Sequence, residues 1–147
     1  MTFLIGGFDE GEPYGCVYEV EVPNNPVPQE KLPFAPTIGG QDELMARLFT
    51  GYDQRILQLT KDRLNLDDNQ VEDLKQHWNQ EMALPIPFQF LPLQDCVNLS
   101  AAMISMTTEI QSWMFGIRGV GGEIDVATIT REEGLQHIKQ KTVRIYE

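Results

Sequence analysis

The order of the predicted elements assigns this chain of 147 residues to the α+β class. Residues 1–40 alternate between apolar runs and turns, residues 41–115 show helical spacing, and residues 123–146 return to strand-like sequence. Strands grouped before and after a block of helices are typical of α+β proteins with antiparallel or mixed sheets. The content of 41% apolar residues is enough for a core, and no linker-like segment divides the sequence, so we expect a single domain over residues 1–147.

Two strands open the chain. Residues 2–8 form an apolar run, and residues 15–22 alternate between two faces, so together they predict a hairpin around the turn-rich residues 9–13. The proline-rich residues 23–28 predict no strand, because proline donates no hydrogen bond to a sheet. A third short strand is predicted over residues 34–38.

Three helices are predicted in the middle of the chain, followed by strands. Apolar side chains recur at helical spacing over residues 41–59 and again over residues 67–82, where prolines then end the pattern. Residues 93–115 are apolar on nearly every side, which predicts a helix packed between other elements. Strands are predicted over residues 123–130 and 135–146.

The charge balance excludes several classes of partner. The chain has 22 acidic and 11 basic residues, which gives a net charge of -11. Nucleic acids and anionic membrane surfaces bind clustered Lys and Arg, so an acidic chain is not expected to bind either. A membrane span needs roughly 18 apolar residues in a row, and the sequence has no such run. The first residues carry no basic segment of a secretory signal. Cys16 and Cys96 allow a single disulfide, but two reduced thiols in a cytoplasmic protein are the favoured reading.

Several motifs resemble ligand sites but have simpler readings. The glycine-rich residues 116–122 follow a helix instead of opening one, so they predict a tight turn and not a phosphate loop. Residues 67–69 lack the alternation and the glycine of a calcium loop, and they predict a helix cap. His77 and His137 have no partner at metal-ligand spacing and are expected to face solvent. No metal and no cofactor is predicted.

Thr2 is the one residue with a specific catalytic reading. Removal of Met1 would leave a free α-amine beside the Thr2 hydroxyl, so that one residue could supply both a base and a nucleophile. That arrangement is the chemistry of N-terminal nucleophile hydrolases. Many proteins begin with Met-Thr without any such activity, so this feature alone supports only an alternative function.

Four segments resemble, in the same order, the second half of a proteasome-type subunit of the N-terminal nucleophile hydrolase superfamily. The segment FLIGGFDEGEPYGCVYEVE (residues 3–21) is similar to a family hairpin, and FAPTIGGQDELMARLF (residues 34–49) is similar to the strand, turn and helix that follow it. Residues 95–115 resemble the next helix, and GVGGEIDVATITREEG (residues 119–134) resembles a glycine turn and strand. Residues 61–94 look like an insertion.

The resemblance implies half of a four-layer αββα sandwich with two to three helices. No segment resembles the first half of the family, which carries the catalytic residues, so we expect a non-catalytic assembly protein or the partner half of a split or truncated hydrolase. The alternative is an amide hydrolase or peptidase that uses Thr2. Half a sandwich leaves apolar strands open, notably residues 2–8 and 123–130. We therefore expect a homodimer or higher oligomer, or a second chain that supplies the missing strands.

Overall fold

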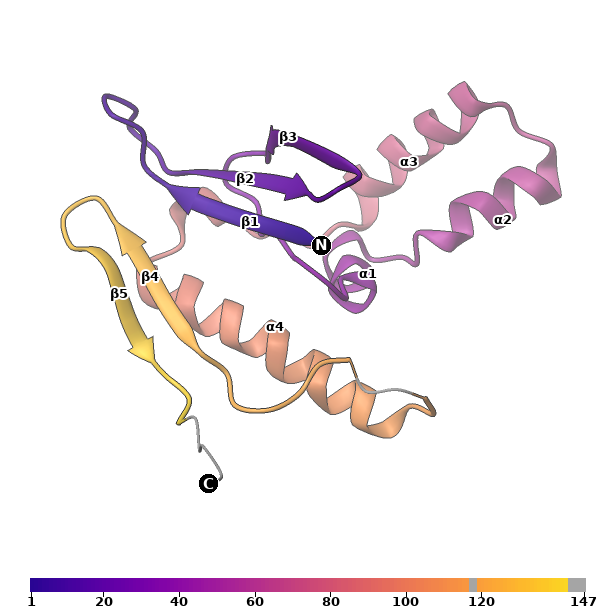
Figure 1. Cartoon of the computed structure of the whole chain (residues 1–147). Coiled ribbons are helices and arrows are strands. Elements are labelled where there is room, and N and C mark those ends of the chain that lie inside the picture. The colour runs from indigo at the N-terminus through magenta and orange to yellow at the C-terminus, as the bar shows by residue number, and fades with distance from the viewer. Residues whose placement is uncertain (117–118, 143–147) are drawn as a thin grey trace. The chain divides into compact units, whose positions relative to one another are not determined.

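The structure is a computed structural model that describes residues 1–116 and 119–142, and its contacts divide the chain into two compact units (Figure 1). Unit 1 is Met1–Gly40 together with Phe88–Glu147, and unit 2 is Gln41–Pro87. The described residues form four α-helices and two antiparallel sheets, which confirms the α+β class. The predicted insertion overlaps unit 2, and the expectation of a single folding domain stays a prediction.

The first sheet of unit 1 has three strands in the order β1-β2-β3 (Figure 1). Strand β1 spans Thr2–Gly7 and pairs antiparallel with β2, which spans Cys16–Glu21. This pairing confirms the predicted hairpin. The alternation of side chains over β2 matches its position in the middle of the sheet, where both edges of the strand are paired.

The third strand lies where the sequence predicted none. Strand β3 spans Asn25–Glu30 and pairs antiparallel with β2, whereas residues 34–38 form no strand. The prediction was wrong because β3 is an edge strand, where proline is tolerated: Pro26 and Pro28 have no partner in the register with β2. Phe34 adopts a left-handed backbone conformation with φ of 57°, which is incompatible with a continuous strand.

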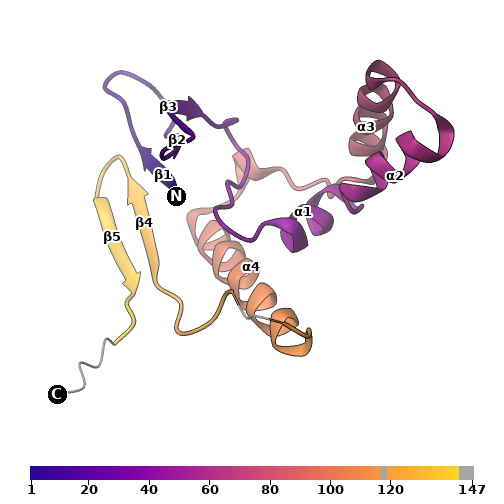
Figure 2. The ribbon, with the colours of Figure 1, turned by 45° about the vertical axis from the view of Figure 1, so that its right-hand side comes forward.

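The rest of unit 1 is a long helix and a second hairpin. Helix α4 spans Leu93–Trp113 after a short 3-10 turn, η1, at Phe88–Phe90. Strand β4 spans Val126–Thr130 and pairs antiparallel with β5, which spans Gly134–Lys139. Helix α4 contacts β4 (Figure 2). The strand predicted over residues 123–130 begins before β4, and the strand predicted over residues 135–146 extends beyond the end of β5. Residues 143–146 of the second prediction lie outside the described residues.

The predicted helix over residues 41–59 is two helices in unit 2. Helix α1 spans Glu43–Thr50 and helix α2 spans Arg55–Leu64, so the structure has one more α-helix than predicted. Gly51 ends α1 in the left-handed conformation with φ of 80°, and its N–H donates to the Arg47 carbonyl over 2.9 Å. A glycine takes this conformation without the steric cost that a side chain adds, which is why the apolar period continues in the sequence while the helix stops.

Helix α3 spans Asp68–Met82 and begins with a capping box. The Asp67 carboxylate accepts a hydrogen bond from the Gln70 N–H, and the Gln70 side chain accepts one from the Asp67 N–H, each at 2.9 Å. The predicted capping role of residues 67–69 is therefore confirmed, with Asp67 as the N-cap and Gln70 as its reciprocal partner.

The apolar core of the described residues lies entirely in unit 2. It consists of Met45, Tyr52 and Leu57, and Met45 is only 2% exposed. In the described part of unit 1 the buried side chains are polar, Thr107 of α4 and Thr128 of β4. The expectation that α4 is packed on nearly every side was wrong, since Ile104, Met106 and Trp113 are exposed on it. No helix among the described residues is both long and apolar enough to cross a membrane.

Candidate functional site

Thr2 lies at the start of β1 and its side chain is exposed. It stands opposite Glu21 in the antiparallel register. The N-terminal ammonium group of Met1 donates to the Val22 carbonyl over 2.7 Å, and the Val22 N–H donates to the Met1 carbonyl over 2.9 Å. These bonds hold the start of the strand in the sheet. The use of Thr2 as a nucleophile stays a prediction.

A hydrolase of this type needs a cation that favours the neutral form of the α-amine. Two lysines, one in each unit, are ion-paired with carboxylates instead. Lys31 forms an ion pair with Glu19 in unit 1, and Lys61 forms one with Asp68 in unit 2. The described contacts therefore place each of these two lysines in an ion pair within its own unit.

Cys16 is the second nucleophilic side chain of the β1–β2 hairpin and lies at the start of β2, opposite Gly7 at the end of β1. Its thiol lies 3.5 Å from a carboxylate oxygen of Asp9. Desolvation and the neighbouring Asp9 carboxylate raise the pKa of the Cys16 thiol above its ordinary value. A thiol with a raised pKa stays protonated and is a poor nucleophile. Both cysteines of the described chain are free thiols, so the predicted unpaired state matches the structure.

The described residues contain no group of His, Cys, Asp and Glu side chains that could hold a metal ion. His77 and His137 are both exposed, as predicted. In the glycine-rich segment, Gly116 and Gly122 have positive φ values of 128° and 90°, which suits the predicted turn. Ile117 and Arg118 of that segment lie outside the described residues.

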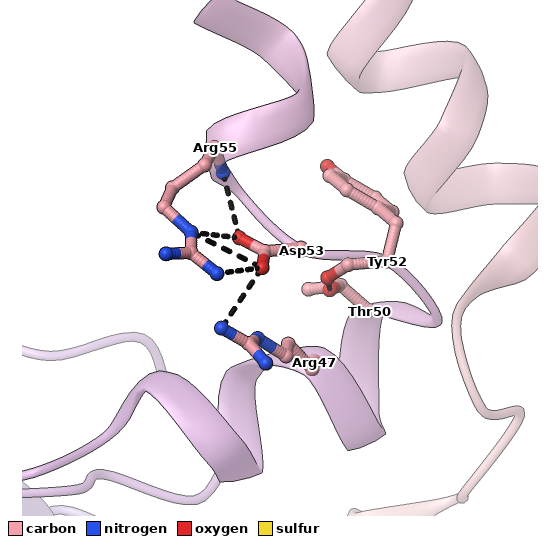
Figure 3. A network of polar contacts seen from close by, with 5 residues as sticks. All are labelled: Arg47, Thr50, Tyr52, Asp53 and Arg55. Carbon is pink, nitrogen blue, oxygen red and sulfur yellow. Dashed lines mark hydrogen bonds and ion pairs between the residues drawn. The ribbon is translucent and has the colours of Figure 1, made fainter. Parts of the chain in front are cut away.

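The densest polar network of unit 2 is centred on Asp53, between α1 and α2 (Figure 3). The Asp53 carboxylate accepts hydrogen bonds from the backbone N–H of Arg55 at 2.9 Å and from its Nη2 at 2.7 Å, and Arg47 Nη2 lies 2.8 Å from it. Side-chain and backbone hydrogen bonds from Arg55 lower the pKa of the Asp53 carboxyl from 3.8 to about 2. So acidic a group stays ionised near neutral pH, which suits a structural ion pair and not a proton donor.

The network was not predicted from the sequence, although a signal for it is present. Asp53 and Arg55 follow Gly51, which ends α1, and an acidic residue just before a new helix satisfies free N–H groups there. An Asp-x-Arg segment one residue after a glycine inside a helical pattern therefore indicates a helix boundary. The continuing apolar period obscured this boundary.

The open edge of β1 is the candidate functional site of unit 1. Met1 and Val22 exchange both of their hydrogen bonds, and such pairs alternate with non-bonded pairs along an antiparallel ladder. The residues opposite Glu21, Glu19 and Val17 therefore direct their N–H and C=O groups away from β2; they are Thr2, Leu4 and Gly6. Among the described residues, β1 has no strand neighbour other than β2.

The side chains of this strand are exposed as well as its edge. Phe3 is 46% exposed, Leu4 41% and Ile5 56%. Phe3 and Ile5 share one face of the strand, and Leu4 lies on the other. On the Leu4 side, the segment at Gly39 comes close enough that a Cβ there would lie 3.2 Å from a Leu4 methyl carbon. One face of β1 is thus partly lined by the chain itself, and the Phe3 face is open.

The total accessible surface of the chain is large for its mass. It is 11666 Å² for 16.7 kDa. Surface scaling gives about 7,600 Å² for a compact monomer of this mass, and about 9,000 Å² for two separate compact bodies with the sizes of units 1 and 2. The excess is therefore more than about 2,500 Å² even when the two units are counted apart.

No protein-family model, characterised protein or solved structure matches the chain at a significant level.

Proposed function

We propose that this chain is a non-catalytic, proteasome-like assembly protein of the cytoplasm, in which unit 1 completes its core against another polypeptide chain. The observation that carries the proposal is the absence of a buried apolar side chain in the described part of unit 1. A sheet or helix stabilises a fold by burying its apolar face, and apolar surface left in water forgoes about 25 cal/mol per Å².

Three elements of unit 1 expose apolar side chains. Strand β1 exposes Phe3 and Ile5, strand β4 exposes Ile129, and α4 exposes Met106 and Trp113. Helix α4 is apolar on several sides and contacts β4. This contact covers only part of the helix, because Met106 and Trp113 remain exposed. Monomeric proteins rarely expose large apolar patches, whereas obligate interfaces bury them.

Hydrogen exchange at several protein concentrations tests this proposal. We expect the amides of β1, β4 and α4 to exchange more slowly as concentration rises, because association covers them. Exchange in the core of α1 and α3 serves as the internal control and should not depend on concentration. Strong protection of β1, β4 and α4 in a monomer, independent of concentration and of added proteins, would overturn the proposal.

The non-catalytic part of the proposal has its own test. The intact mass of the protein isolated from its native cells reports whether Met1 is retained, and a retained Met1 excludes the hydrolase alternative. If Met1 is removed, we expect a hydroxyl-directed electrophile such as a β-lactone to leave Thr2 unmodified. Stoichiometric acylation of Thr2, lost in the Thr2→Ala variant, would contradict a non-catalytic role.

A further inference from the structure

The four strand edges that are unpaired among the described residues of unit 1 differ in how well they are protected against pairing. Natural sheets protect their edges with proline, charged side chains, bulges or a covering element. Strand β1 has none of the first three: its sequence TFLIGG has neither a proline nor a charge, and its register with β2 is regular over all six residues. An uncharged apolar edge with free backbone groups favours the addition of another strand.

The other three edges each carry at least one protecting feature. Strand β3 contains Pro26 and Pro28 and ends at Glu30. Strand β5 carries Lys139, and its pairing with β4 shifts register between Val126 and Ala127. Strand β4 shares that irregularity. Strand β1 is therefore the edge of unit 1 that is best suited to pair with a strand of another chain.

We infer that two copies of this chain associate through β1, antiparallel about a two-fold axis at Leu4; this inference rests on the proposed function and names the partner. The outward groups belong to Thr2, Leu4 and Gly6, so only registers that pair these residues with each other form hydrogen bonds. Placing Leu4 opposite the partner's Leu4 also pairs Thr2 with the partner's Gly6. This register uses every outward N–H and C=O group of β1, and a shift by two residues leaves some unpaired.

The same register brings the exposed side chains into favourable pairs. Phe3 then stands directly opposite the partner's Ile5, and the two-fold axis repeats the pair with the roles exchanged. These are non-hydrogen-bonded positions, where side chains approach most closely. Pairs of an aromatic and a β-branched residue across antiparallel strands are among the stabilising ones. Pairing would cover two side chains that are about half exposed in the single chain.

Charge and area support a second copy as the occupant. The chain has a net charge of -11, so two copies repel wherever their acidic surfaces meet. Strand β1 offers a contact line without charged side chains. The accessible surface of each copy exceeds that of two compact bodies of the same masses by more than about 2,500 Å² over both units together, and an obligate dimer buries about 2,000–5,000 Å² in total. A two-fold axis closes such an interface without leaving β1 open.

Substitution by proline at Leu4 tests the edge. The Leu4 N–H points away from β2, so Leu4→Pro should keep the β1–β2 ladder and block the second copy. We expect light scattering to give twice 16.7 kDa for the wild type and 16.7 kDa for Leu4→Pro, with unchanged far-ultraviolet circular dichroism. The control Leu4→Ala keeps the N–H group and should remain dimeric at micromolar concentration.

Cysteine crosslinking tests the register without depending on the fold of the proline variant. Phe3→Cys and Ile5→Cys are made separately in a Cys16→Ser, Cys96→Ser background and then co-expressed. We expect mild oxidation to link the two variants, and each variant alone to give little crosslinked dimer. A dimer that persists in Leu4→Pro and forms no such crosslink would overturn the β1 pairing but leave the proposed function standing. A wild type that is monomeric with protected β1 amides would overturn both.

Discussion

The carboxylate of Asp53 accepts hydrogen bonds from both the backbone N–H and the guanidinium group of Arg55, two residues further along the chain. The Arg47 guanidinium approaches the same carboxylate from α1. One side chain therefore ties the end of α1 to the start of α2. The residue at the N-cap of α2, Gln54, makes no side-chain capping bond, so Asp53 supplies the carboxylate at that helix start.

The first prediction concerns the pH dependence of the stability that the ionised Asp53 carboxylate contributes. Because the pKa of Asp53 is lowered from 3.8 to about 2 in the folded state, its contribution to stability is present above pH 3.8. It is lost as the pH falls toward 2, where the folded carboxyl takes up a proton. Titration followed by carboxyl carbon chemical shifts should give a midpoint near 2 for Asp53.

The Arg55→Gln variant is the matched test of the cause. It removes the guanidinium donors and keeps the backbone N–H, so the pKa of Asp53 should rise toward 3.8. A midpoint that is the same in Arg55→Gln and in the wild type would show that Arg55 is not responsible for the shift.

The second prediction concerns Gly51. A Cβ built on this residue would lie 2.4 Å from the Met82 carbonyl oxygen, a distance that requires α1 or the end of α3 to move. Its φ of 80° adds the intrinsic penalty of the left-handed conformation, about 1–2 kcal/mol. We expect Gly51→Ala to abolish slow hydrogen exchange in α1 and α3.

Gly40→Ala is the control for Gly51→Ala. Gly40 has a similar φ of 86°, but a Cβ there would meet no heavy atom within 4 Å. It should therefore show only the conformational penalty of about 1–2 kcal/mol, without loss of protection in unit 2. Equal effects of the two substitutions on α1 and α3 would mean that the contact with Met82 is not maintained in solution.

The third prediction concerns Tyr52, the buried aromatic residue of unit 2. Its hydroxyl donates to the Asn79 side-chain oxygen over 2.8 Å, and its ring packs edge-on against Trp78 at 5.3 Å between centroids. Tyr52→Phe should lower the free energy of unfolding by about 1 kcal/mol through the lost hydrogen bond. Tyr52→Ala should lower it by about 3–5 kcal/mol and unfold unit 2.

Chemical denaturation of the two Tyr52 variants measures both effects, with Tyr14→Phe as the control on an exposed ring. Tyr14 packs against Phe34 but is exposed, so the control should change the free energy of unfolding by no more than about 0.5 kcal/mol. A Tyr52→Phe variant as damaging as Tyr52→Ala would place the stabilisation in the hydroxyl group and not in the ring.

The fold class and the first hairpin were predictable because their signals are local. The alternation of residues 15–22 and the apolar run of residues 2–8 specify a strand pair without reference to the rest of the chain. The position of β3 was not predictable from local rules, because proline is excluded from a central strand but tolerated at an edge. Whether a strand is central or at an edge is set by the topology of the whole sheet.

The candidate site was predictable in part. The sequence identified the start of β1 as an open apolar strand, but it could not say which backbone groups face outward. That follows from the pairing of Met1 with Val22, which fixes the alternation along the ladder. The burial of α4 was overestimated because apolar residues on every side of a helix favour burial but do not specify which neighbours cover each side; Ile104, Met106 and Trp113 remain exposed.

The last prediction concerns Trp113, at the C-terminal end of α4. If α4 were buried, Trp113→Ala would lower the free energy of unfolding by about 3–5 kcal/mol. The Trp113 residue is 75% exposed in the single chain, so in the monomeric Leu4→Pro background we expect Trp113→Ala to change the free energy of unfolding by no more than about 0.5 kcal/mol.

Fluorescence measures the exposure of Trp113 directly. The chain has two tryptophans, so Trp78→Phe isolates the emission of Trp113. That emission should be red-shifted and readily quenched by iodide, whereas the emission of Trp78 in Trp113→Phe should be less accessible because its ring contacts Tyr52. A blue-shifted, protected Trp113 in the monomer would mean that α4 is covered within the chain, and the assembly proposal would lose its support from this helix.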